Sequence, residues 1–138
     1  MMKRDEIMKI LPHREPMLLV DEVELVDGEA VGRYTVRGDE FFLQGHFPGN
    51  PVVPGVILCE MMGQAACLLA GADAGGSTPY FTGMKNIKFK NKVVPGDTIE
   101  FRGVLTAKKG AFHFIKSSGH VNGQLCVSGE LSFAVIGG

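Results

Sequence analysis

Residues 55–70 form the longest apolar segment of the chain, and this segment most constrains the fold. Pro54 and Gly55 start it, and Gly71 fits a C-terminal cap, so the segment predicts one long helix. Its side chains are apolar on nearly every face: Val56, Ile57, Leu58, Cys59, Met61, Met62, Ala65, Ala66, Cys67, Leu68, Leu69 and Ala70. Such a helix must be buried all round. We therefore expect a sheet that wraps around it and a second subunit that covers the remainder.

Strand-like segments flank this helix on both sides. They are expected over residues 17–26, 30–37, 80–92, 97–108, 111–121 and 124–136. Asp27-Gly28 and Asn122-Gly123 are hairpin signals, so consecutive strands should pair antiparallel. A short amphipathic helix is expected over 3–11, with loops over 38–54 and 72–79. One main helix against one curved antiparallel sheet is an α+β fold.

Length and composition narrow the class of protein. With 138 residues and 45% hydrophobic residues, the chain fits one domain, residues 1–138, with a sizeable core. A net charge of −1 argues against nucleic acid as the main ligand. The longest apolar stretch contains Glu60 and Gln64, so we expect no membrane span. The N-terminal residues lack the apolar region of a signal peptide.

The three cysteines indicate a reducing compartment. Cys59 and Cys67 would lie about 12 Å apart on one helix, too far for a disulfide. Cys126 is far away in the sequence, and no CxxC motif occurs. We therefore expect three reduced thiols and a cytoplasmic location.

Glu60 and Gln64 are the only charged or amide side chains between Val56 and Ala70. Their spacing of four residues places them on one face of the helix. Removing a carboxyl group from water favours its neutral form, which can protonate a leaving group. The alternatives are a structural glutamate bound to backbone and a solvent-facing glutamate at the helix edge.

His46 begins a stiff loop, and the loop leads into the start of the helix. Pro48 fixes its own φ and restricts Phe47, so the imidazole is held rigidly and suits a general base. A structural or solvated histidine is the alternative. The first N–H groups of the helix at Gly55 are unpaired and partly positive, which suits an enolate oxygen.

The remaining polar groups give weaker signals. His13, His113 and His120 are expected to be structural. Lys88, Lys90, Lys92, Lys108 and Lys109 form either a solvated surface or a docking patch for an acidic partner. No clustered Cys/His pattern, nucleophile motif or phosphate-binding glycine loop occurs, so we expect neither a metal nor a cofactor.

Three groups of residues, in order along the chain, resemble one family. They are Leu11-Pro12-His13-Arg14 with Pro16 and Leu18-Leu19-Val20-Asp21; Gly45-His46-Phe47-Pro48-Gly49 with Pro51, Pro54-Gly55-Val56, Glu60 and Gln64; and Lys88-Phe89 with Val93-Val94-Pro95-Gly96-Asp97. This pattern resembles the 3-hydroxyacyl-[acyl-carrier-protein] dehydratases of type II fatty-acid synthesis, the FabZ type. It spans almost the whole chain.

The resemblance implies a hotdog fold, in which a curved antiparallel sheet wraps one helix. It further implies a homodimer, which in many members assembles as a trimer of dimers, with a tunnel-shaped active site at the dimer interface. The sequence leaves dimer or hexamer open. His46 of one subunit would remove the C2 proton, and Glu60 of the other would protonate the C3 hydroxyl. Gln64 would orient Glu60, and the N–H groups of Gly55 and Val56 would hold the thioester oxygen. The substrate partner would be acyl carrier protein, facing the lysines.

Other readings stay open at this level. Relatives that also isomerise the double bond typically carry aspartate in place of Glu60, so the glutamate favours simple dehydration, although some glutamate-bearing relatives isomerise as well. A hotdog thioesterase and a non-catalytic acyl-binding module are the competing hypotheses. A binding module would need neither His46 nor Glu60.

Overall fold

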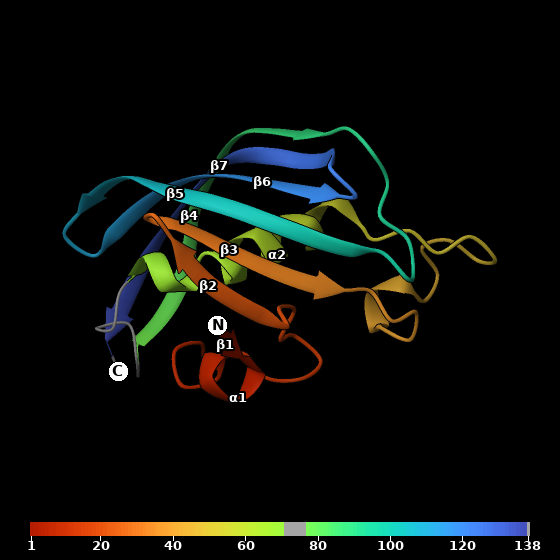
Figure 1. The fold of residues 1–138 in the computed structure, drawn as a ribbon, viewed down its shortest axis with the longest axis horizontal. Helices are drawn as coiled ribbons and strands as arrows, with labels where there is room; N and C mark the ends of the chain where they lie inside the picture. Colours follow the sequence, from red (N-terminus) through yellow and green to blue (C-terminus); the bar gives the residue numbers. More distant parts are fainter. Residues whose placement is uncertain (71–76, 138) are drawn as a thin grey trace.

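Seven antiparallel strands curve around one helix in the computed structural model, which describes residues 1–70 and 77–137 (Figure 1). The elements in chain order are β1 (Met2–Lys3), α1 (Arg4–Ile7), β2 (Glu22–Val26), β3 (Glu29–Thr35), the 3-10 helix η1 (Phe41–Leu43), α2 (Gly55–Ala65), the 3-10 helix η2 (Cys67–Ala70), β4 (Ser77–Phe89), β5 (Thr98–Lys109), β6 (Phe112–Val121) and β7 (Gln124–Gly137).

The strand order is β1-β2-β3-β5-β6-β7-β4. Hairpins join β2 to β3, β5 to β6 and β6 to β7, and the first and last of them lie at the predicted turns Asp27-Gly28 and Asn122-Gly123. At the last turn Asn122 and Gly123 have φ of +50° and +80°, the left-handed pair that a two-residue hairpin requires. After β3 the chain passes through α2 and returns as β4 at the far edge, beside β7. This topology confirms the predicted α+β class and the hotdog fold.

The core lies between α2 and the concave face of the sheet. α2 contacts β3, β5, β6 and β7, and its buried side chains include Leu58, Cys59, Met61 and Met62. The sheet of this chain alone does not cover the whole helix, and the cover expected from a second subunit stays a prediction. Val56 is 74% exposed, so the sheet leaves the N-terminal end of α2 uncovered.

Several predicted boundaries need correction. The strand expected over 17–26 begins at Glu22, because the carbonyl of Met17 and the N–H of Leu19 bond to Gln64 of α2 and not to a neighbouring strand. The amphipathic helix expected over 3–11 is a single turn, α1, preceded by β1 and followed by turns.

The main helix is also shorter than predicted. It ends at Ala65 because Ala66, with ψ of 8°, leaves the α region, and the chain continues as η2. The expected cap Gly71 and most of the loop predicted over 72–79 lie outside the described residues.

Among the described strands, β4 forms one edge of the sheet, and only one of its sides pairs, with β7. Register shifts between Phe81 and Gly83 and between Lys85 and Lys88 bend it around α2. Three of its large apolar side chains are at least half exposed: Tyr80, Met84 and Phe89. An unpaired edge with exposed apolar side chains is a surface suited to pairing with another chain.

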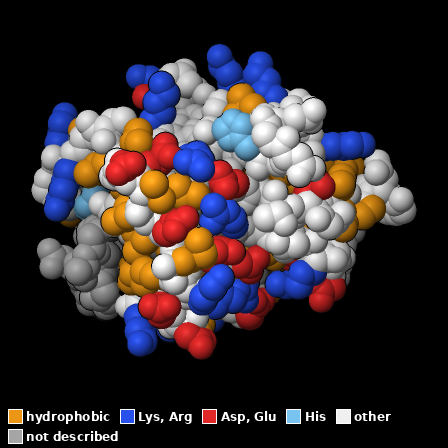
Figure 2. Space-filling view, in the orientation of Figure 1, with side chains coloured by type: hydrophobic (Ala, Val, Ile, Leu, Met, Phe, Trp, Pro, Cys, Tyr) orange, Lys and Arg blue, Asp and Glu red, His pale blue; other side chains and the backbone are white. Residues whose placement is uncertain are grey.

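Charged side chains of both signs are interspersed with hydrophobic ones on the face drawn in Figure 2. Among the described residues, no helix is both long and apolar enough to cross a membrane.

Candidate active site

Glu60 and Gln64 lie on one face of α2, turned toward the segment that precedes β2. The Gln64 side chain is 2% exposed. Its Nε2 donates to Oε2 of Glu60 at 2.7 Å and to the carbonyl of Met17 at 2.8 Å. Its Oε1 accepts the N–H of Leu19 at 2.7 Å. Gln64 is therefore fixed by backbone groups and in turn fixes one oxygen of Glu60.

His13 also contacts this carboxyl group. Its Nε2 lies 3.3 Å from Oε2 of Glu60, and both side chains are about one-fifth exposed. The expectation of a purely structural His13 missed this contact, because nothing local in the sequence brings a turn near residue 13 to a helix near residue 60. The only available signal was its place in the Leu11-Pro12-His13-Arg14 motif that carries the family resemblance.

His46 is oriented by the loop that leads into α2. Its Nδ1 lies 2.8 Å from the carbonyl oxygen of Val52, and its ring stacks on Phe47 with centroids 4.1 Å apart. A carbonyl oxygen only accepts hydrogen bonds, so Nδ1 carries the proton. In the neutral ring, Nε2 then keeps its lone pair, as a general base requires.

The N-terminus of α2 offers two free donors. Pro54 is the N-cap residue and supplies no side-chain cap. Within the described structure, the N–H groups of Gly55 and Val56 donate to no protein group, whereas those of Ile57 and Leu58 bond to the Pro54 carbonyl. These free donors at the positive end of the helix suit an oxyanion.

A close contact also explains why residue 55 is glycine. A Cβ on Gly55 would lie 2.9 Å from the ring of Phe89, the last residue of β4. The helix start and the end of β4 therefore pack directly against each other.

His46 and Glu60 face different surroundings within one chain. Across the described residues, no hydrogen bond or ion pair joins them: His46 bonds to Val52, and Glu60 faces His13 and Gln64. The loop that carries His46 and the helix α2 that carries Glu60 thus present the candidate base and the candidate acid separately.

The predicted lysine patch divides into two groups. Lys88 pairs with Ser128 of β7, whereas Lys109 lies opposite Phe112, whose partner on β7 is Ala134. Ser128 and Ala134 are six residues apart, roughly 20 Å along a strand. Lysines at opposite ends of the sheet do not form one docking patch.

The first lysine group lies beside the start of α2. β4 ends at Phe89, so Lys90 and Lys92 follow the strand, although the predicted strand extended to residue 92. Lys88, Lys90 and Lys92 are all exposed. Phe89, between the first two, contacts Gly55, so the backbone that carries these lysines passes beside the start of α2. The Lys88 side chain itself points to the opposite face of the sheet.

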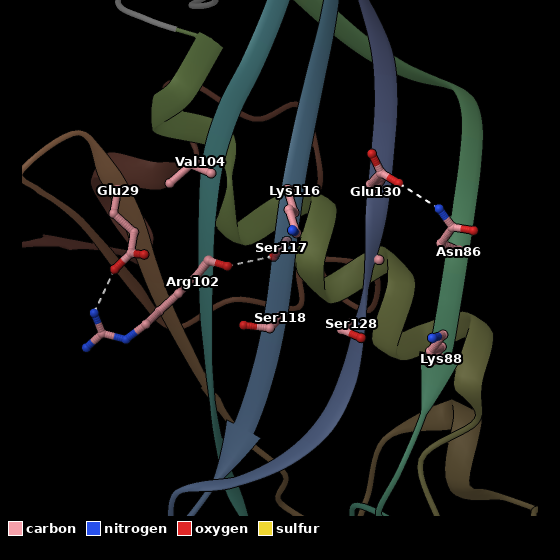
Figure 3. A pocket seen from close by; sticks show the side chains of 11 residues that line it. Glu29, Asn86, Lys88, Arg102, Val104, Lys116, Ser117, Ser118, Ser128 and Glu130 are labelled. Atoms are coloured by element: carbon pink, nitrogen blue, oxygen red, sulfur yellow. Dashed lines mark hydrogen bonds and ion pairs between the residues drawn. The ribbon is translucent and has the colours of Figure 1, made fainter.

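The face of the sheet turned away from α2 carries a hollow of about 510 Å³ (Figure 3). It includes Lys88, but not His46 or Glu60. Four of its polar side chains form two pairs: Arg102 donates to Glu29 at 2.8 Å and Asn86 to Glu130 at 2.9 Å. This hollow is therefore separate from the candidate active site.

The other histidines and the described thiols lie elsewhere. His113 is buried and stacks on Phe133, with centroids 5.4 Å apart, and His120 lies on β6. Cys59 and Cys126 are buried free thiols whose pKa is raised by burial. The side chain of Cys67 is outside the described part. No group of three or more His, Cys, Asp or Glu side chains suits a metal within that part.

Comparison with known proteins identifies the family. A family model of FabA-like domains matches residues 11–130. The 3-hydroxyacyl-[acyl-carrier-protein] dehydratase FabZ of Clostridium perfringens is 41% identical over 138 residues, which cover 98% of this chain and 99% of the relative. The FabZ of Oenococcus oeni is 43% identical over 138 residues, with 97% and 99% covered.

A solved structure agrees on the fold. The dehydratase heterocomplex ApeI:P from Xenorhabdus doucetiae aligns with a TM-score of 0.81 at 22% identity, covering 94% of this chain and 90% of that one. The sequence matches extend over nearly the full length and include the segments that hold His46 and Glu60. The chain therefore belongs to the FabA-like family and, within it, to the FabZ-type 3-hydroxyacyl-[acyl-carrier-protein] dehydratases.

Proposed function

We propose that the protein dehydrates (3R)-3-hydroxyacyl-[acyl-carrier protein] to trans-2-enoyl-[acyl-carrier protein] in fatty-acid biosynthesis. The observation that carries this proposal is how hydrogen bonds orient the two candidate side chains. His46 has its Nδ1 committed to Val52 and Nε2 left as a base, while Glu60 is anchored through Oε2 by Gln64.

The base step falls to His46. Its Nε2 would remove a proton from C2, next to the thioester carbonyl. The electron pair then forms the C2–C3 double bond by way of an enolate, and the negative charge on the thioester oxygen is held by the N–H groups of Gly55 and Val56. The ring keeps its orientation during this step because Val52 accepts its other N–H.

The acid step falls to Glu60. Its carboxyl proton would pass to the C3 hydroxyl, the C–O bond breaks, and water leaves. The proton that His46 took from C2 then passes to Glu60, which restores the starting protonation of both groups. Gln64 keeps the carboxyl group at a fixed place on α2, and general acid or base groups of this kind contribute about 10²–10⁴-fold to rate.

The site would be completed by a second copy of the chain. Val56, Glu60 and Gln64 follow one another at intervals of four residues and so lie along one face of α2. Val56 is 74% exposed and Gln64 2% exposed, so this face opens toward the helix start. A dimer formed along the free edge of β4 would cover the open end and bring His46 of one subunit to Glu60 of the other. Three such dimers would form the trimer of dimers that many members of the family adopt.

The acyl group would be delivered by acyl carrier protein, an acidic partner, to Lys88, Lys90 and Lys92 beside the start of α2. Lys108 and Lys109 are excluded from this docking surface by their position. The buried free thiols of Cys59 and Cys126 are consistent with a location in the cytoplasm. We further propose that residues 1–138 form one domain, which works without a cofactor and binds neither nucleic acid nor membranes.

An assay of the wild type, His46→Ala and Glu60→Gln with 3-hydroxyacyl carrier protein tests the proposal. We expect enoyl product from the wild type and a loss of about 10²-fold or more in both variants. Full activity in either variant would refute the role given to that residue. Release of free thiol without enoyl product would indicate a thioesterase, and binding without turnover an acyl-binding module.

A further inference from the structure

His13 is held beside Glu60 by its own neighbour. The guanidinium group of Arg14 donates to the carbonyl of His13 at 2.7 Å and to those of Leu11 and Met8 at 2.9 and 3.2 Å. These bonds fix the turn that follows α1. The imidazole therefore approaches Glu60 from a rigid backbone, in a different segment of the chain from the loop of His46.

The two ring nitrogens of His13 have different surroundings. Nε2 lies 3.3 Å from Oε2 of Glu60, whereas Nδ1 is buried and has no partner among the described residues. A doubly protonated ring would bury an unpaired, charged N–H group, which is costly. The neutral ring with its proton on Nε2 avoids this cost and turns its one donor toward Glu60.

Oxygen Oε2 of Glu60 then faces two donors, Gln64 and His13, and acts as an acceptor toward both. A carboxylic acid carries its proton on one oxygen only. With Oε2 occupied as an acceptor, the proton must reside on Oε1.

We propose that His13 is a positioning residue that, together with Gln64, directs the acidic proton of Glu60 to Oε1. This inference rests on the proposed dehydratase function, in which Glu60 is the acid. It adds a residue outside the His46–Glu60 pair. His13 would act through the orientation of the carboxyl group, without touching the reacting atoms.

Two variants separate this role from simple packing. His13→Gln keeps an N–H donor near the position of Nε2, whereas His13→Phe fills the space without a donor. With 3-hydroxyacyl carrier protein, we expect His13→Phe to lower kcat about 10-fold to 100-fold at nearly unchanged KM, as for a misoriented catalytic group. His13→Gln should recover most of the loss. Equal thermal stability of the two variants keeps the comparison valid; equal kcat in both and in the wild type would overturn the proposal.

Nitrogen NMR of histidine-labelled protein tests the contact without any assay. We expect His13 to be neutral with its proton on Nε2, and its Nε2 signal to move in Glu60→Ala but not in the control His120→Gln. A His13 signal unaffected by Glu60→Ala would overturn the contact. If the wild type forms no enoyl product, the proposed function fails, while the NMR result still decides whether His13 contacts Glu60.

Discussion

Gln64 donates a hydrogen bond from Nε2 to Oε2 of Glu60 at 2.7 Å, across one turn of α2. The same amide binds the backbone of Met17 and Leu19. Through Gln64, the carboxyl group of Glu60 is thus connected to the segment that precedes β2. Catalytic geometry and folding stability should therefore change together when Gln64 is replaced.

Replacing Gln64 with leucine should affect both properties. The buried N–H of Leu19 and carbonyl of Met17 would lose their partner, which costs about 1–3 kcal/mol of unfolding free energy. Glu60 would lose its anchor, so kcat should also fall. Urea unfolding and enoyl formation measure the two effects. The matched control is Gln44→Leu, an exposed glutamine, expected within about 0.5 kcal/mol of wild type; equal effects at both sites would contradict the account.

Gly55→Ala tests the packing at the start of α2. Alanine favours a helix over glycine by about 1 kcal/mol, but its Cβ would lie 2.9 Å from the Phe89 ring. In the wild-type background we expect destabilisation of about 1–3 kcal/mol. In a Phe89→Ala background the same substitution should stabilise the protein. A double-mutant cycle of unfolding free energies measures this reversal, and the same sign in both backgrounds would argue against the contact.

Tyr34 and Glu40 form a buried pair that should set the pH range of stability. Burial alone would raise the pKa of Glu40, but hydrogen bonds from Tyr34 and from the N–H groups of Arg37 and Gly38 lower it below the ordinary 4.5. Burial and the bond to Glu40 raise the pKa of Tyr34 above its ordinary 10.0.

The two shifts act at opposite ends of the pH scale. Because the folded-state pKa of Glu40 is depressed, the ionised carboxylate stabilises the fold above about pH 4.5, and this stabilisation is lost as the pH falls. Because the folded-state pKa of Tyr34 is raised, the protonated hydroxyl stabilises the fold below about pH 10, and this stabilisation is lost as the pH rises. Tyr34→Phe should lower stability at neutral pH by about 1.5–3 kcal/mol and flatten the alkaline decline. Urea midpoints across pH measure this, with exposed Tyr80→Phe as control; a wild-type profile in Tyr34→Phe would count against the pair.

Reversing the charges of Lys88 and Lys90 tests carrier-protein docking. We expect KM for the carrier-protein substrate to rise about 10-fold at low salt, since complementary charges mainly speed encounter. A small acyl thioester should react as before. The matched control reverses Lys108 and Lys109 at the far end of the sheet and should leave KM unchanged. The docking assignment fails if the two double variants behave alike.

The sequence predicts the fold well where a local signal decides the structure. Asn122-Gly123 determines its hairpin through backbone preference alone, and the apolar run of α2 requires a surrounding sheet. The resemblance also identified Glu60 with Gln64, and the structure joins them by a hydrogen bond.

Long-range packing decides the features that the sequence did not reveal. Leu19 leaves the strand pattern because its N–H binds Gln64, forty-five residues away. His13 meets Glu60 for the same reason, since the turn that follows α1 reaches α2. The lysines near residues 88 and 109 carry equal charge in the sequence, and only the register of β4, β7, β6 and β5 shows that they are far apart.

Mixing two inactive variants tests the central claim most directly. If His46 of one subunit works with Glu60 of its neighbour, a dimer of one His46→Ala chain and one Glu60→Gln chain contains one intact site. Unfolding and refolding the variants together at equal amounts should then restore about a quarter of wild-type enoyl formation, because half of the dimers are mixed and each has one of two sites. Activity no higher than that of the separate variants, in dimers shown to have exchanged subunits, would contradict the shared site.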